Sequence, residues 1–170
     1  MDLKRVIRDV PDFPVPGILF RDITPVLADP AAFRIAIEGL EELLRPLRFD
    51  LFAAVESRGF LLAAPLAVRS GKGLVILRKP GKLPAATVSL SYALEYGEAT
   101  LQVHADAVRP GQRVVIVDDL LATGGTAEAS GRLMEKLGAD VAAFAFLVEL
   151  SDLAGRAKLE PVPVFSLVKY

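Results

Sequence analysis

The segment from Val114 to Thr126 constrains the fold of this chain more than any other part of its sequence. Four consecutive β-branched residues are followed by two adjacent aspartates and by a turn of small residues that contains two glycines. A helical pattern then runs from about Thr126 to Leu137. Strands that are buried in a parallel sheet read as continuous apolar runs. The segment therefore predicts a strand, a turn and a helix of an α/β fold.

The same alternation of apolar strands and amphipathic helices continues along the chain. Further strands are predicted over 51–55, 74–77 and 141–148, and further helices over 30–47 and 60–68. This order predicts a central, mostly parallel sheet with helices on both faces. Two weaker alternating stretches, 88–92 and 99–103, predict a hairpin-like arm that folds over the site.

The N-terminal part, up to about residue 33, differs from the rest because it is rich in proline. Proline fixes φ and removes a backbone donor, so this part is expected to form a short helix followed by irregular, extended chain. We expect it to form a small hood beside the sheet. The length of 170 residues suits one domain over 1–170.

Composition excludes several functional classes. The net charge of −1 and the pI near 5.9 provide no basic field for nucleic acid. The absence of cysteine excludes thiol nucleophiles and cysteine zinc sites, and the single histidine, His104, is expected to be an ordinary surface residue. No signal-peptide core is present and no segment approaches the ~20 apolar residues of a membrane span, so no membrane partner and a cytoplasmic location are expected.

Charged or glycine-containing turns follow three of the predicted strands, at 56–59, 78–82 and 118–126. Ligands of open α/β sheets bind beyond the carboxyl ends of the strands, so these turns are expected to meet in one crevice. At 118–126, helix N–H groups and threonine hydroxyls would donate to a phosphate, while the carboxylates would accept from a ribose diol directly or through Mg²⁺. An ordinary surface turn is the alternative. No P-loop or dinucleotide fingerprint occurs.

The 114–126 segment resembles the phosphoribosyl pyrophosphate (PRPP) signature of type I phosphoribosyltransferases, and in particular that of the adenine phosphoribosyltransferases. The likeness extends to Phe13–Pro25, Glu56–Phe60, Arg78–Pro84, Leu94–Gly97 and Val148–Leu150. It implies the type I fold and purine salvage, in which adenine and PRPP give AMP and pyrophosphate. It also implies Mg²⁺ as cofactor and a homodimer in which a basic residue near Arg78 reaches the partner's site.

The resemblance also implies roles for individual residues. Ribose hydroxyls would bind Asp118 and Asp119, and the 5′-phosphate would bind Ala122, Thr123, Gly124, Gly125 and Thr126. Pyrophosphate would bind Ser57, Arg58, Gly59, Arg78, Lys79 and Lys82, with a cis peptide bond expected between Glu56 and Ser57. Adenine would lie between Phe20 and Leu150, with the backbone of Leu19 and Arg21 reading its edge.

Catalysis would fall to Glu95 and Arg58, with Tyr96 beside Glu95 in the arm. Glu95 would either stabilise the positive charge on the sugar or assist proton removal from adenine. Mg²⁺ would be held mainly through PRPP, with Asp118 and Asp119 as the candidate protein ligands. Two alternatives are another phosphoribosyltransferase, acting on hypoxanthine, guanine, xanthine or orotate, and a regulator that senses PRPP on this fold. The chain lacks the length and the basic charge of a nucleic-acid-binding regulator.

Overall fold

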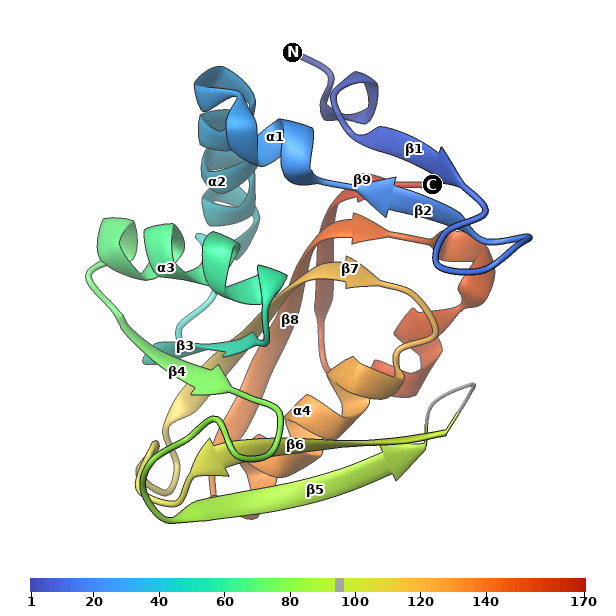
Figure 1. Cartoon of the computed structure of the whole chain (residues 1–170). Helices are drawn as coiled ribbons and strands as arrows, with labels where there is room; N and C mark the ends of the chain where they lie inside the picture. Colours follow the sequence, from blue (N-terminus) through green and yellow to red (C-terminus); the bar gives the residue numbers. More distant parts are fainter. Residues whose placement is uncertain (94–96) are drawn as a thin grey trace.

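A five-stranded parallel sheet forms the centre of the protein in a computed structural model that describes residues 1–93 and 97–170 (Figure 1). Its strand order is β4-β3-β7-β8-β9, and every neighbouring pair is parallel. The strands are β3 (Leu51–Val55), β4 (Gly73–Leu77), β7 (Arg113–Leu121), β8 (Asp140–Glu149) and β9 (Val164–Lys169).

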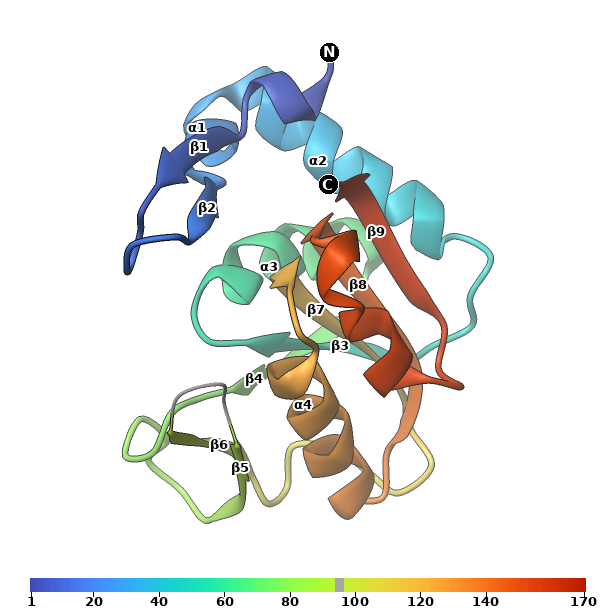
Figure 2. The same ribbon diagram turned by 90° about the vertical axis from the view of Figure 1, so that its right-hand side faces the viewer.

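Helices cover both faces of this sheet. The helices α2 (Pro30–Leu44) and α3 (Arg58–Ser70) lie on one face, while α4 (Gly125–Lys136) lies on the other, as Figures 1 and 2 show. Each layer buries its own apolar cluster against the sheet, with Leu40 and Leu62 on the first face and Leu133 on the second. The predicted α/β architecture with helices on both faces is therefore confirmed.

The proline-rich N-terminal part forms the predicted hood. It consists of a 3-10 turn, an antiparallel strand pair and a short helix: η1 (Leu3–Arg5), β1 (Arg8–Pro11), β2 (Leu19–Asp22) and α1 (Thr24–Ala28). The buried side chains of Leu3, Ile7, Ile23 and Val26 belong to the same apolar cluster as α2 and α3. The hood is thereby joined to that face of the sheet, and its β1–β2 loop extends over the side to which the strands point (Figure 1).

The predicted arm is an antiparallel hairpin of β5 (Thr87–Ala93) and β6 (Glu98–His104). The backbones of Arg78 and Gln102 exchange hydrogen bonds of 2.9 and 2.7 Å, which attach β6 to the end of β4. The expectation that His104 is a surface residue is wrong, because it is half-buried and its Nε2 atom finds no hydrogen-bond partner among the described residues.

Several element bounds differ from those predicted. The helix α2 ends at Leu44 instead of Leu47, and β7 continues four residues beyond Val117 because it stays paired with β8 as far as Glu149. Asp118 and Asp119 therefore lie within a strand and not in a turn. Irregular chain was expected where β1 and β2 form an antiparallel pair. Strand β9 and helix α1 were not predicted, and neither were the 3-10 turns η2 (Ser151–Leu153) and η3 (Gly155–Leu159). None of the described helices is long and apolar enough to cross a membrane.

Candidate active site

The strand order reverses direction between β3 and β7, and the predicted acidic and pyrophosphate-binding residues meet there. From β3 the chain proceeds outward to β4 on one side and then to β7, β8 and β9 on the other. Ligands of open α/β sheets bind at such a switch point, beyond the carboxyl ends of the strands. The pairing of β7 with β3 ends at Val117, so Asp118 and Asp119 lie beyond the part of β7 that is paired with β3.

Helix α3 begins directly after β3, and its first turn packs closely against β7. A Cβ atom at Gly59 would lie 2.8 Å from the carbonyl oxygen of Val117 and 3.1 Å from Oδ1 of Asp118, so no side chain fits there. Arg58, the preceding residue, donates Nε–H to the buried carboxylate of Asp119. Ser57 precedes the helix, and the Glu56–Ser57 peptide bond is cis, as the resemblance implied.

The two adjacent carboxylates differ in their electrostatic environment. Burial raises the pKa of Asp118 well above its usual range, and the carboxylate of Asp119 adds to this effect. The backbone N–H of Asp119, 2.8 Å from Oδ1 of Asp118, acts in the opposite direction. Asp119 instead receives the guanidinium of Arg58. The charge of Asp119 is thus compensated by Arg58, whereas Asp118 holds its proton strongly.

The turn between β7 and α4 lines a cavity of about 530 Å³. The helix α4 begins after Gly124, which has φ +84° and provides no side-chain cap, so the first N–H groups of the helix are free of capping side chains. Those groups and the helix dipole attract an anion. All residues predicted to bind the 5′-phosphate and the ribose line this cavity: Asp118, Asp119, Ala122, Thr123, Gly124, Gly125 and Thr126.

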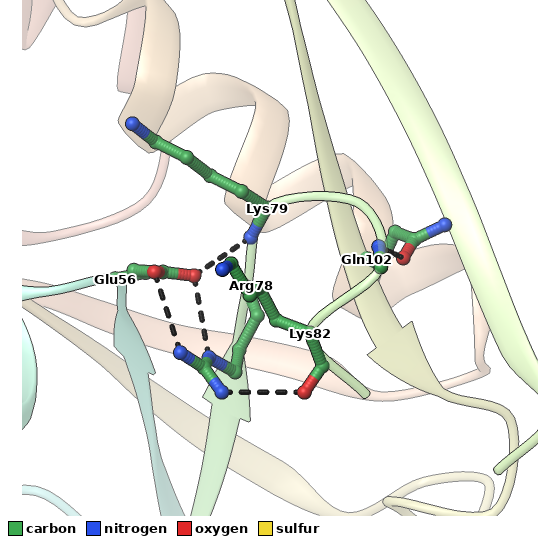
Figure 3. A network of polar contacts seen from close by, with 6 residues as sticks. Glu56, Arg78, Lys79, Lys82 and Gln102 are labelled. Atoms are coloured by element: carbon green, nitrogen blue, oxygen red, sulfur yellow. Dashed lines mark hydrogen bonds and ion pairs between the residues drawn. The ribbon is translucent and has the colours of Figure 1, made fainter. Parts of the chain in front are cut away.

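The basic turn after β4 is organised by Glu56 (Figure 3). The Glu56 carboxylate accepts from Nε and Nη2 of Arg78 at 3.2 and 3.4 Å, and from the backbone N–H of Lys79 at 2.8 Å. The N–H of Lys79 is the main cause that lowers the pKa of Glu56, against the effect of burial. Arg78 also donates to the carbonyl oxygen of Lys82. Its guanidinium therefore braces this turn, while the Lys79 side chain points away from Glu56.

A smaller hollow of about 320 Å³ adjoins the first one and shares Arg58, Asp118, Asp119 and Thr126 with it. Of the residues predicted to bind pyrophosphate, Ser57, Arg58 and Lys79 line it, whereas Gly59, Arg78 and Lys82 do not. An arginine, a lysine and a helix N-terminal turn provide the donors and the positive charge that a pyrophosphate group requires. The three turns predicted to converge are therefore brought together.

The hood residues predicted to bind adenine stand farther out. None of Leu19, Phe20, Arg21 and Leu150 lines either hollow in the described part of the chain. Phe20 nevertheless faces the site, since the Arg58 guanidinium lies 5.5 Å from its ring centroid. Arg21 pairs with Asp9 and lies over the ring of Tyr170, which ties the hood to the C-terminal end of the chain.

Sequence reasoning missed several residues of this site. The Tyr92 hydroxyl lies 3.2 Å from Oγ1 of Thr126, and Lys158 of η3 lines the larger cavity. Arg156 forms an ion pair with the buried Glu149, which carried no signal because the two residues follow no spacing rule. Glu95 and Tyr96, predicted to be a catalytic residue and its neighbour, lie outside the described residues. No group of three or more histidine, cysteine or acidic side chains in the described part could hold a metal ion.

Residues 23–168 match the family described as phosphoribosyl transferase domain. The match covers nearly all of the central sheet, both helical layers and every residue that lines the two hollows, but not Leu19, Phe20 and Arg21 of the hood. The chain belongs to this family. A phosphoribosyl transferase domain with acidic residues beside a phosphate-binding turn is also what the predicted resemblance implied, so the fold class and the family prediction are both confirmed.

Relatives of this phosphoribosyltransferase share its entire length. A curated protein from Synechococcus sp., named adenine phosphoribosyltransferase, is 56% identical over 170 residues, which is 100% of this chain and 99% of the relative. The crystal structure of adenine phosphoribosyltransferase from Thermoanaerobacter pseudethanolicus is 57% identical, with a TM-score of 0.96 over 98% of this chain and 97% of the other. That of the Saccharomyces cerevisiae enzyme, complexed with adenine and an imino-altritol bisphosphate, is 41% identical, with a TM-score of 0.91 over 97% and 96%.

Because the pKa of Asp118 is raised, we predict that its ionised carboxylate lowers the free energy of unfolding. The folded state holds the proton of Asp118 more tightly than the unfolded chain does. The contribution of this proton to folding stability is therefore fully present below pH ~3.9 and is lost as the pH rises through the raised pKa. Asp118→Asn removes this loss, and we expect its free energy of unfolding at pH 7 to exceed that of the wild type. Urea denaturation between pH 4 and 8 measures the difference, which should grow with pH.

Asp106→Asn is the matched control because Asp106 is exposed and lies outside the site. This variant should follow the wild-type stability across the whole pH range. Equal or lower stability of Asp118→Asn at pH 7 would show that the Asp118 carboxylate does not destabilise the folded protein.

Proposed function

We propose that the chain is an adenine phosphoribosyltransferase that converts adenine and PRPP into AMP and pyrophosphate, in purine salvage. The observation that carries the proposal is the meeting of hydroxyl acceptors and phosphate donors at the β3–β7 switch point. PRPP requires both groups side by side. The names of the full-length relatives, and the adenine held in the yeast structure, support adenine as the accepted base.

The two hollows suit the two ends of PRPP. The 5′-phosphate would bind the first-turn N–H groups of α4 and the hydroxyls of Thr123 and Thr126, which line the larger cavity. The ribose hydroxyls would donate to Asp118 and Asp119. The pyrophosphate would then reach the smaller hollow, where Ser57, Arg58 and Lys79 gather. A single PRPP molecule would thus occupy both hollows and lie across the residues that they share.

The chemistry needs positioning and charge stabilisation more than a covalent nucleophile. The bond between ribose C1 and the pyrophosphate oxygen breaks, and a nitrogen of adenine forms the new bond to C1 from the opposite face. The pyrophosphate keeps the bonding electrons, and the nitrogen loses its proton. Arg58 and Lys79 would stabilise the departing pyrophosphate anion. The carboxylates of Asp118 and Asp119 would lie near the ribose and stabilise its positive charge. The close approach of Gly59 to β7 holds these groups in one place.

Adenine would enter between the hood and the end of β8. Phe20 already lies beside Arg58, with Phe13 edge-on to it at a centroid distance of 5.0 Å, and Leu150 follows the last residue of β8. A flat apolar slot with a few polar backbone groups suits a purine. Leu19, at the start of β2, is 45% exposed.

Magnesium fits the acidic pair as an oxygen-donor set. Asp118 and Asp119 could supply at most two carboxylates, so most ligands would come from PRPP and water, which is how Mg²⁺ binds nucleotide phosphates. When bound, the ion would neutralise charge on the pyrophosphate. A cation there would also lower the pKa of Asp118, against the burial and the Asp119 charge that raise it.

The activity is tested by incubating the purified protein with Mg²⁺, PRPP and one base at a time. Adenine should give AMP and equimolar pyrophosphate, whereas hypoxanthine, guanine, xanthine and orotate should give products at rates lower by about 10⁴-fold, as for a site that hydrogen-bonds its substrate. Product from another base would overturn the assignment of adenine but keep the reaction. Binding of PRPP without product from any base would favour the PRPP-sensing regulator.

Glu95 is proposed as a catalytic residue, from the family resemblance of the arm segment. Glu95→Gln should lower kcat at saturating substrates on the order of 100-fold, since a charge or proton acceptor would be lost in the transition state. Initial rates of AMP formation give the value. Glu98→Gln, at the start of β6 in the same arm, is the matched control and should retain the wild-type kcat. A wild-type kcat in Glu95→Gln would remove the residue from catalysis.

A homodimer in the cytoplasm is part of the proposal, and α3 offers a face for pairing. Leu61 and Val68 lie two helical turns apart on α3 and are 48% and 83% exposed. Apolar side chains that share one exposed helix face mark interaction surfaces. Light scattering should give twice the chain mass of 18.2 kDa. Val68→Glu should lower this mass to that of one chain, while Ala28→Glu, exposed on α1, should not. A monomeric wild type would refute the dimer.

A further inference from the structure

We propose that the ion pair of Glu149 and Arg156 is a positioning device for the phosphate-binding turn, holding Gly155 against Ala122 and Gly124. The inference rests on the proposed function, because it assigns this pair a role in binding PRPP. It concerns a part of the molecule outside the turns that the sequence singled out, namely the 3-10 turn η3 that follows β8.

The pair is a two-point contact at the end of β8. Glu149 is 5% exposed, and its two carboxylate oxygens accept from Nε and Nη2 of Arg156 at 3.0 and 2.6 Å. The third nitrogen, Nη1, donates to the carbonyl oxygen of Val164 in β9 at 2.6 Å. These bonds to Arg156 are the main cause that lowers the pKa of Glu149. A planar guanidinium with three engaged nitrogens has a fixed position relative to both strands.

Arg156 directly follows Gly155, which is buried against the phosphate-binding turn. A Cβ atom at Gly155 would lie 2.1 Å from the carbonyl oxygen of Ala122 and 2.9 Å from the backbone nitrogen of Gly124. In the reverse direction, a Cβ atom at Gly124 would lie 2.4 Å from the carbonyl oxygen of Gly155. The two backbones therefore touch without a side chain between them. Because Arg156 is the next residue after Gly155, the position of Arg156 determines how Gly155 contacts the turn at Ala122 and Gly124.

This contact has a direct bearing on phosphate binding. Ala122 and Gly124 line the larger cavity, and Gly124 leads into the first turn of α4, whose N–H groups would bind the phosphate. Glu149 and Arg156 do not line the cavity, so they act through the turn and not on the substrate. A displacement of about 1 Å in such a group costs on the order of 100-fold in rate. Since the Arg156 side chain is 37% exposed, the ion pair adds little net stability, and its value here is geometric.

The first test uses Arg156→Lys and Glu149→Gln in the full-length enzyme. Lysine retains the charge but has only one nitrogen, so it cannot hold both Glu149 and Val164 in place. We expect each variant to raise the KM and the calorimetric Kd for PRPP about tenfold, with the KM for adenine within about twofold of the wild type. Arg113→Lys is the matched control, because Arg113 pairs with Asp140 at the opposite end of β7 and β8. It should leave both KM values unchanged.

The second test moves the turn without touching the ion pair. Gly155→Ala places a methyl group against the Ala122 carbonyl, and we expect a rise in the KM for PRPP of about 100-fold. Gly73→Ala is its control, since that Cβ would lie 3.8 Å from Leu51 in ordinary contact. The double variant Gly155→Ala with Arg156→Lys should be no worse than Gly155→Ala alone, because both act through one contact.

The proposal is overturned if the variants fold as the wild type, by thermal denaturation, and still bind PRPP with a Kd within about twofold of it. It is also overturned if the KM values for PRPP and adenine rise equally, since this would indicate a general loss of structure. If Arg156→Lys and Glu149→Gln fail to fold, Gly155→Ala decides alone. A wild-type protein that binds PRPP but makes no AMP would refute the proposed function, and the PRPP affinities would still test the positioning role.

Discussion

The close approach of the first turn of α3 to the end of β7 sets the geometry of the whole site. Only a residue without a side chain fits at Gly59, because any Cβ would meet the Val117 carbonyl and the Asp118 carboxylate. The approach lets Arg58 reach Asp119 across the switch point of the sheet. Arg58, which suits a pyrophosphate group, and Asp119, which suits ribose hydroxyls, thus lie side by side. A displacement at the ribose carbon that bears the pyrophosphate requires both kinds of group close together.

Electrostatic strain accompanies this arrangement. Arg58 pairs with Asp119, whereas burial, and after it the charge of Asp119, raises the pKa of Asp118. A fold optimised only for stability would not keep both. Elsewhere the charges are paired in ways that support the site: Glu56 organises the basic turn and Glu149 receives Arg156. Glu56 follows the last residue of β3 and holds the turn after β4, whereas Glu149 ends β8 and holds the segment that follows it.

Much of the fold followed from local pattern. The strands over 51–55, 74–77 and 141–148 agree with β3, β4 and β8 to within one residue at each end, and the hairpin arm was also predicted. Strand β9 was missed although 164–169 is strand-like, because Pro161 and Pro163 stand directly before it. The extension of β7 to Leu121 could not be predicted, since pairing with β8 and not residue type keeps Asp118 and Asp119 in the strand.

The sequence by itself determined the local units and their chemistry: apolar strands, an acidic pair followed by a glycine turn, and the helix that begins there. These follow from neighbours along the chain, whose periodicity and donor or acceptor groups can be read directly. Only the tertiary structure decided which distant groups meet, such as Arg58 with Asp119, 61 residues apart, and Gly155 with Ala122. Such contacts depend on strand order and on backbone approach, which leave no periodic trace in the sequence.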